Sequence, residues 1–246
     1  MNVMPGTWVA ADDDELGIQF AIAGSFGDVA LHHHPAVQVA VGLDGPIEVT
    51  TADGSTRTCR AVAIAGGTRH ALGCAAGVTP LSLYLRPDIG PGGGINARAR
   101  GDIWVIDDDA LCDDVARVLD AEGLPAAARR LVAELGARTA AREGHPQLRQ
   151  AIDLLRTGPV DLVSAARAVA LSPDYLGRLF KEQTGTSFSA TARWLRLVAG
   201  LERLRAGGSV TDAAHSAGFT DGAHANRACW ELLGAAPSRL ARNFAE

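Results

Sequence analysis

The clearest chemical signal in this chain is a run of three histidines, His32, His33 and His34, followed by Gln38 and, much further along, by His70. If the run lies on a strand, His32 and His34 point to one face and His33 to the other. Gln38, four positions after His34, returns to the first face. Three neutral imidazoles and a carboxamide oxygen are donors that hold a divalent transition metal. We therefore expect four of these side chains, all except His33, to meet in one site.

This spacing resembles the metal-binding pattern of the cupin family, in which an HxH pair, a Glu four residues later and a distant His hold the ion. The matching positions are His32, His34, Gln38 and His70. The resemblance implies a small β-barrel with one divalent transition metal, Zn²⁺, Ni²⁺ or Fe²⁺. The chain departs from the pattern at Gln38, where the anionic ligand is missing. A second interpretation stays open, in which the histidines form the hydrogen-bonding walls of a metal-free pocket for an unknown small-molecule effector.

The residues up to about Pro87 are predicted to form the scaffold that positions this site. Short runs of β-forming residues, several of them alternating in polarity with period two, are separated by Gly-containing turns. The runs are GIQFAIAG (17–24), VQVAVGL (37–43), IEVTT (47–51), AVAIA (61–65) and VTPLSLYL (78–85). Because no helical segment separates them, we expect an antiparallel β-barrel or sandwich, and an α+β fold for the whole chain.

The next segment, PGGGINARARG (91–101), is predicted to be a flexible Gly-rich connection, followed by helices over about 109–122 and 125–142. Each helix carries an apolar stripe, formed by Leu111, Val115, Val118 and Leu119 in the first and by Leu131, Val132 and Leu135 in the second. Such stripes either form the seam of a homodimer or cover the barrel. The first interpretation predicts a homodimer through this segment.

The C-terminal region contains one pattern twice: a short Ala-rich helix, a turn and an amphipathic helix. In the first copy, residues 164–185, Ser172 is placed to cap a helix that begins with Pro173. The apolar residues of this helix share one face, which predicts a helix-turn-helix unit. The face is formed by Tyr175, Leu176, Leu179 and Phe180, and the residues expected to point outward are Asp174, Gly177, Arg178 and Lys181.

In the second copy, residues 209–234, Gly218 supplies the left-handed residue that ends the first helix, and Phe219 fills the turn. Arg and Asn are the side chains best shaped to read the edges of G and A. Two such units predict two major-groove contacts. The outward-facing residues expected to contact DNA in this copy are Gly222, His224, Asn226 and Arg227.

Between the two copies, residues 188–206 are predicted to form one connecting helix. Its apolar stripe contains Trp194, Leu197, Val198, Leu201 and Leu204. A helix of this length is about 28 Å long, and successive major grooves on one face of B-DNA are about 34 Å apart. A rigid connection of this size lets one protomer contact two groove segments.

Residues 145–242 resemble the DNA-binding domain of the AraC/XylS family of transcriptional regulators. The resemblance rests on LSPDYLGRLFKEQTGTSF and SVTDAAHSAGFTDGAHANRACWELLGAAPSRL, which stand in matching order and spacing. It implies two helix-turn-helix subdomains that bind double-stranded promoter DNA, joined to an effector-binding barrel. Ala225 and Cys229 stand where the family usually has aromatic residues, so we expect looser DNA binding by the second unit.

These observations divide the chain into a sensor barrel (1–90), a connecting segment (91–143) and a DNA-binding domain (144–246). Lys and Arg outnumber Asp and Glu by 12 to 9 from Gly144 onward, whereas the preceding residues carry 11 and 19. The basic excess therefore lies on the half predicted to bind phosphates. We expect a cytoplasmic regulator with no membrane segment and no catalytic residues. The alternatives are a cupin-type metal-dependent enzyme with an added helical domain and a ligand-independent architectural DNA binder.

Overall fold

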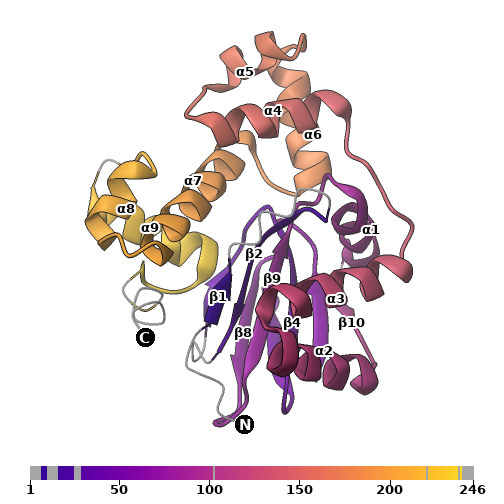
Figure 1. Ribbon diagram of the computed structural model, residues 1–246. Helices are drawn as coiled ribbons and strands as arrows, with labels where there is room; N and C mark the ends of the chain where they lie inside the picture. Colours follow the sequence, from indigo (N-terminus) through magenta and orange to yellow (C-terminus); the bar gives the residue numbers. More distant parts are fainter. Residues whose placement is uncertain are drawn as a thin grey trace.

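The chain combines an N-terminal β-region with a helical C-terminal half. The computed structural model describes residues 7–9, 16–24, 29–101, 103–219, 221–237 and 239. Figure 1 shows the strands on one side of the molecule and the C-terminal helices above and beside them. The predicted α+β class, with antiparallel β-structure followed by helices, is confirmed.

The strands pair in two antiparallel sheets, and no ladder joins the sheets among the strands described. All five predicted β-forming runs lie on strands of these sheets. The larger sheet contains, in spatial order, β1 (Thr7–Val9), β2 (Ile18–Ala23), β9 (Pro80–Leu85), β4 (Val37–Gly42), β7 (Ala61–Ile64) and β10 (Ile103–Val105). The smaller sheet contains β3 (Val29–His32), β8 (His70–Cys74), β5 (Ile47–Thr51) and β6 (Thr56–Cys59).

The two sheets pack face to face through a small apolar layer that includes Ala40 and Val62 of the larger sheet and Ile47 and Val49 of the smaller one. The other face of the larger sheet is covered by two antiparallel helices, α2 (Asp109–Glu122) and α3 (Leu124–Ala137) (Figure 1). The sheet region is therefore three layers deep, and a site between the sheets is shielded from solvent on the helix side.

The apolar stripes of α2 and α3 are buried against the larger sheet. Val115, Leu131 and Leu135 are completely buried, in one cluster with Val39 and other residues of the larger sheet. The stripes therefore cover the sheet and do not form the seam of a homodimer. Helix α3 also ends at Ala137 rather than at 142. The chain leaves the helix there because the residues that follow pack against residues 90–94, where Arg142 N donates to the carbonyl of Gly90 at 3.2 Å. The homodimer itself remains a prediction.

The Gly-rich segment predicted to be flexible is instead helix α1 (Gly90–Ala99). Its glycines are required by close backbone contacts: a Cβ on Gly92 would lie 2.1 Å from the carbonyl oxygen of Arg86, and one on Gly93 would lie 2.1 Å from that of Arg142. Local propensity opposes a helix here, since each glycine costs about 1 kcal/mol relative to alanine. Tertiary packing overrides that preference.

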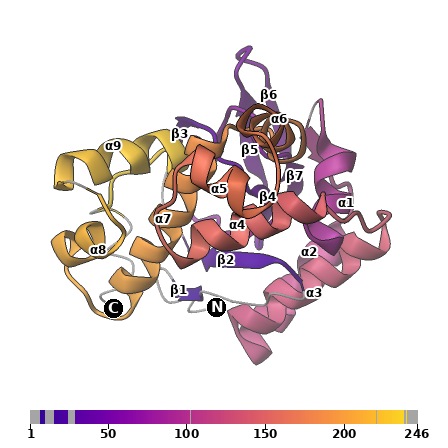
Figure 2. The same ribbon diagram turned by 90° about the horizontal axis from the view of Figure 1, so that it is seen from above.

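The C-terminal half consists of α4 (Pro146–Thr157), α5 (Leu162–Ala168), α6 (Pro173–Thr184), α7 (Phe188–Arg205), α8 (Val210–Ser216) and α9 (Gly222–Leu233). Its core is continuous with the larger sheet, because Phe20 and Tyr84 belong to the same cluster of buried residues as these helices. Figure 2 shows α7 beside β2, and α9 beside β3. Arg86, buried at the end of β9, binds both Asp88 at 2.7 Å and Asp153 of α4 at 3.1 Å. No helix in the described ranges is long and apolar enough to span a bilayer.

Candidate functional site

Three of the predicted ligands meet between the two sheets. The antiparallel pairing of β3 with β8 places His32 directly opposite His70, with ring centroids 4.3 Å apart. His34 follows β3 and lies 5.3 Å from His70, again between ring centroids. One ring nitrogen of each of the three histidines lies within 4.8 Å of the others. His33 is only half-buried and does not join this cluster, as the alternation of strand side chains predicts.

The Nδ1 atom of each histidine is fixed by a backbone carbonyl. The distances are 2.9 Å from His32 to Ala30, 3.0 Å from His34 to Ala36 and 2.9 Å from His70 to Thr68. A carbonyl oxygen only accepts, so each Nδ1 carries the proton and each neutral ring keeps its lone pair on Nε2. This arrangement orients the rings and leaves three Nε2 lone pairs for the site, as in histidines that bind metals.

Gln38, the fourth predicted ligand, lies on β4 against the same nitrogens. Its Oε1 atom is 3.1 Å from His34 Nε2 and 2.8 Å from His70 Nε2, and its Nε2 donates to Ser82 Oγ at 3.2 Å. An oxygen and two lone pairs provide no proton for either short contact. The contacts are satisfied if the amide is turned so that its NH₂ group donates to both rings, or if a cation accepts all the electron pairs.

The Nε2 atom of His32 separates these two arrangements. It is buried and has no hydrogen-bond partner. A turned Gln38 amide has only two N–H groups, both directed at the other histidines, so it leaves His32 Nε2 unsatisfied. An unpaired buried acceptor costs about 1–3 kcal/mol. A cation held by His32, His34, His70 and Gln38 satisfies every donor atom, so the residues present fit a metal.

Burial keeps the three imidazoles neutral. It lowers the pKa of His32 to about 4 and that of His34 to about 3, and it lowers the pKa of His70 as well. Removal from water is the largest cause in each case, and repulsion from the neighbouring rings adds to it for His34 and His70. At pH 7 the cluster therefore presents lone pairs rather than positive charges, which is the form that binds a transition metal.

The cluster is closed by an aromatic side chain from the helical half. The ring of Trp194 on α7 lies 5.0 Å from that of His34, and the ring of Tyr84 lies 5.1 Å from it. Trp194 Nε1 donates to Gln19 Oε1 of β2 at 2.9 Å. Sequence reasoning placed Trp194 only in the apolar stripe of a connecting helix, and nothing in its spacing could have shown that it contacts the histidines.

The first helix-turn-helix unit is formed by α5 and α6. Asp161 Oδ1 accepts from Ser164 N at 3.0 Å and caps α5, and Ser172 Oγ accepts from Tyr175 N at 3.3 Å and caps α6. The predicted outward residues Asp174, Arg178 and Lys181 are exposed, and Gly177 is half-buried. At the end of this face, Lys181 Nζ donates to the carbonyl of Gly185 at 3.2 Å.

Tyr175 was predicted to lie on the buried apolar face of α6, but it does not join the core. It stands at the edge of the apolar stripe and keeps 38% of its surface exposed, whereas Leu176, Leu179 and Phe180 are buried. The guanidinium of Arg178 lies 5.7 Å from the centre of the Tyr175 ring, a cation–π distance. Tyr175 therefore belongs to the exposed face and steadies the arginine expected to read bases.

The second unit is formed by α8 and α9. Ser209 and Asp212 make a capping box on α8, and Asp221 Oδ1 accepts from His224 N at 2.6 Å to cap α9. Gly218 has the expected left-handed conformation, and Phe219 is buried in the turn. Gly222, Asn226 and Arg227 are exposed, whereas the ring of His224 is half-buried and lies 5.3 Å from that of Phe219.

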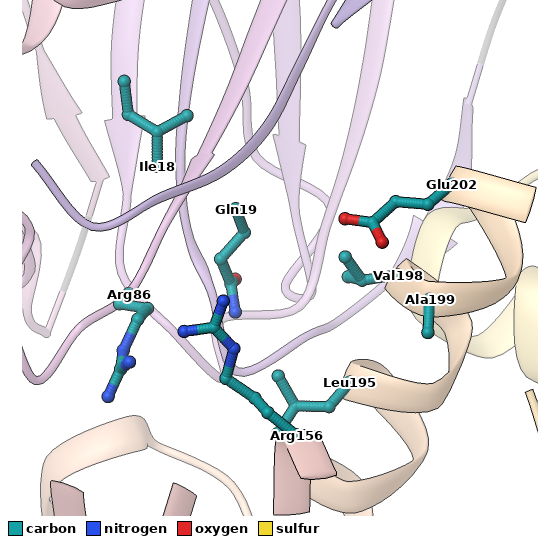
Figure 3. Close-up of a pocket in the computed structure, with 8 residues that line it drawn as sticks. All are labelled: Ile18, Gln19, Arg86, Arg156, Leu195, Val198, Ala199 and Glu202. Carbon is teal, nitrogen blue, oxygen red and sulfur yellow. The ribbon is translucent and has the colours of Figure 1, made fainter. Parts of the chain in front are cut away.

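A second candidate ligand site lies where the two halves of the chain meet. A cavity of about 230 Å³ is lined by residues of β2, α4 and α7. Figure 3 shows the Arg156 side chain reaching toward Gln19, with the Glu202 carboxylate on the other side of the opening. The apolar part of the wall is formed by Ile18, Leu195, Val198 and Ala199. Gln19 also holds Trp194, so this cavity adjoins the residue that closes the histidine cluster.

The sequence is similar to known helix-turn-helix proteins. A helix-turn-helix domain family matches residues 165–243. Over 102 residues, or 40% of this chain, the sequence is 33% identical to the HTH-type transcriptional regulator GlxA of Rhizobium meliloti (strain 1021), and the match covers 32% of that protein. The chain thus spans about a third of the length of that relative.

The whole fold is similar to solved structures of ToxT from Vibrio cholerae. An apo form from strain SCE256 superposes with a TM-score of 0.66 over 92% of this chain and 98% of that one, at 9% identity. Wild-type ToxT with a bound unsaturated fatty acid superposes with a TM-score of 0.61 over 90% and 92%, at 10% identity. At such low identity the likeness establishes the fold alone.

Proposed function

We propose that this chain, whose C-terminal region is an AraC-type helix-turn-helix domain, is a transcriptional regulator that binds double-stranded promoter DNA and responds to an effector held in its N-terminal domain. The observation that carries the proposal is the repetition of one capped helix-turn-helix unit, with exposed arginines on both second helices. Arg178 stands on α6 and Arg227 on α9. Bidentate contacts from such arginines to guanine are the commonest specific contacts in the major groove.

The test uses the full chain. Duplexes are selected from a random library, and the affinity for the selected site is compared with that for a scrambled duplex by fluorescence anisotropy at fixed salt. A regulator of this kind binds its site about 10³-fold or more tightly than random DNA. Equal affinity for the selected and scrambled duplexes would show that the protein does not read sequence.

The effector that the histidine cluster supports best is one divalent transition metal, Zn²⁺, Ni²⁺ or Fe²⁺. His32, His34 and His70 would hold it through Nε2, with Gln38 through Oε1. The support is the donor chemistry: three lone pairs and a carbonyl oxygen meet without a proton, and the buried Nε2 of His32 has no other partner. Elemental analysis of protein purified without chelators tests the assignment.

An organic effector is the second candidate. The cavity between β2, α4 and α7 favours it, because its wall combines apolar side chains with Arg156 and Glu202. ToxT, which has a similar fold, has been crystallised with an unsaturated fatty acid. Mass spectrometry of small molecules released on denaturation distinguishes this case from a metal effector.

A cupin-type metal-dependent enzyme is less well supported. His32, His34 and His70 are at most 1% exposed, and Trp194 lies against His34. A substrate would have to displace the Trp194 side chain to reach the ion. The same burial suits a regulatory ion, which needs to be bound and released but not approached by a substrate.

A further inference from the structure

Each histidine of the cluster lies beside a different part of the DNA-binding domain. His32 ends β3, and this edge of the sheet is joined by two backbone hydrogen bonds to the last turn of α9. Ala30 N donates to the carbonyl of Gly234 at 3.0 Å, and His33 N donates to that of Glu231 at 3.2 Å. The second helix-turn-helix unit is therefore held by the backbone on either side of His32.

His70 is preceded by a loop that contacts the end of the first unit. Gly66 and Gly67 of this loop lie so close to Gly185 that a Cβ on Gly185 would meet the carbonyl oxygen of Gly66 at 2.0 Å. Asn96 of α1 bridges the same contact: its Oδ1 accepts from Gly66 N at 3.0 Å, and its Nδ2 donates to the carbonyl of Gln183 at 3.3 Å.

Gly185 lies at the junction between the first unit and the connecting helix, and we call this junction the Gly185 hinge. It ends α6 with a left-handed φ of +73°, and α7 begins three residues later at Phe188. Changes in backbone angles at such a glycine alter the direction of α6 relative to α7 at little steric cost. The loop that contacts this hinge also accepts from His70 through the Thr68 carbonyl, and Gly67 N donates to the carbonyl of His34 at 2.8 Å.

The third contact reaches the connecting helix itself. His34 lies against Trp194 of α7, which is held in place by Gln19. Each ring is tied to its own backbone through Nδ1, so a ligand that binds all three rings also restrains three backbone segments. These segments contact α9, the Gly185 hinge and α7.

We propose that a divalent metal bound by His32, His34 and His70 fixes the relative orientation of the two helix-turn-helix units by holding the Gly185 hinge and the end of α9 against the sensor domain. This inference rests on the proposed function. With metal bound, the protein recognises half-sites of one spacing. Without metal, the contacts with the sensor domain open more often and the protein tolerates altered spacing.

The first experiment measures hydrogen exchange of the full chain with EDTA and with one equivalent of Zn²⁺. The amides to follow are those of Ala30 and His33, which bind α9, and that of Gly66, which binds Asn96. We expect exchange at least fivefold slower with Zn²⁺, within the usual range of coupling between two sites. Unchanged exchange in protein that has bound stoichiometric Zn²⁺ would overturn the inference and leave the metal site intact.

The second experiment measures binding to the selected duplex and to one with five base pairs inserted between the half-sites, about half a helical turn. The Zn²⁺-loaded protein should discriminate between them at least tenfold, and the EDTA-treated protein less than threefold. Equal discrimination in the two states would contradict the inference. Absence of sequence-specific binding in both states would instead contradict the proposed function.

Two variants test the path of the coupling. Asn96→Ala removes the bridge to Gln183, and Trp194→Phe keeps an aromatic ring while removing the bond to Gln19; neither changes a metal ligand. Both should bind Zn²⁺ stoichiometrically and lose most of the difference between the duplexes. Arg117→Ala, on the exposed face of α2, is the matched control and should behave as wild type. If either folded variant keeps the full Zn²⁺ effect, its contact does not carry the coupling; if both do, the proposed path is wrong.

Discussion

Ala170 and Gly218 occupy equivalent positions in the turns of the two helix-turn-helix units, and both have left-handed backbones, with φ of +56° and +73°. The residues that follow them, Leu171 and Phe219, each donate their N–H to the carbonyl five residues earlier, at 2.9 and 3.0 Å. The two turns therefore share one geometry, and only the second has the residue that adopts it without strain.

This relationship predicts opposite effects of two substitutions on the free energy of unfolding. An L-residue in the left-handed region costs about 1–2 kcal/mol, while a glycine costs about 0.4–1 kcal/mol through the entropy of the unfolded chain. Ala170→Gly should therefore raise stability slightly, by less than about 1 kcal/mol, and Gly218→Ala should lower it by about 1 kcal/mol. A Cβ on Gly218 would meet only the Arg196 side chain at an ordinary 3.7 Å. Urea denaturation measures both, and a neutral Gly218→Ala would contradict the assignment.

Arg178 is predicted to read a base. Its replacement by Ala should weaken binding to the selected duplex by about 1–3 kcal/mol and relax the preference at one base position. Arg227→Ala should have a smaller effect at the other half-site, because the second unit is expected to bind DNA more loosely, and Arg117→Ala should have no effect. Fluorescence anisotropy with single-base variants of the duplex gives the measurement. If Arg178→Ala weakens specific and scrambled duplexes equally, this side chain contacts phosphate instead.

The histidine cluster is predicted to bind one metal ion. Replacing both His32 and His34 by Ala should abolish stoichiometric Zn²⁺ binding in calorimetry, because two of the four donors are lost. His33→Ala should bind Zn²⁺ as wild type does, since His33 lies outside the cluster. Gln38→Glu should tighten binding by supplying an anionic ligand. If wild-type protein binds none of Zn²⁺, Ni²⁺ and Fe²⁺, the metal assignment is wrong and the Gln38 amide is turned so that it donates to His34 and His70.

The buried histidines also predict how the metal-free protein responds to acid. Their pKa values are lowered in the folded protein, to about 4 for His32 and about 3 for His34, whereas unfolded histidines titrate near 6.5. Below pH 6.5 the unfolded chain therefore takes up protons that the folded protein does not. The contribution of these histidines to the free energy of unfolding should therefore be constant above that pH. As the pH drops from 6.5 to about 4, it should fall by about 1 kcal/mol per pH unit for each such histidine.

Urea denaturation in EDTA at pH 7, 6 and 5 measures this slope. His34→Gln removes one of the buried titrating groups and should reduce the slope. Identical slopes in wild type and His34→Gln would mean that the cluster takes up protons without unfolding.

Much of the helical half follows from local sequence. Ser172 and Pro173 determine where α6 begins, because a capping hydroxyl and a missing N–H suit the first turn of a helix whatever packs against it. The same applies to Gly218, which can take a left-handed backbone without a Cβ clash. The apolar stripe of residues 109–122 likewise predicted α2, with the observed boundaries. These features depend on neighbours within one or two turns, so a single sequence contains them.

The tertiary structure alone decided how the elements meet. The periodicity of His32 and His34 indicates a shared face, but only the register of β3 with β8 brings His70 opposite His32. In the sequence, Trp194 is one apolar residue of a helical stripe. Only the packing of α7 on the sheet shows that it closes the site. The Gly-rich composition of residues 91–101 disfavours a helix, yet most of this segment lies in α1, where its glycines let other backbone segments pack closely against the helix. In each case the stabilising free energy comes from contacts between segments that are distant in the sequence. Local propensity and periodicity contain no information about such contacts.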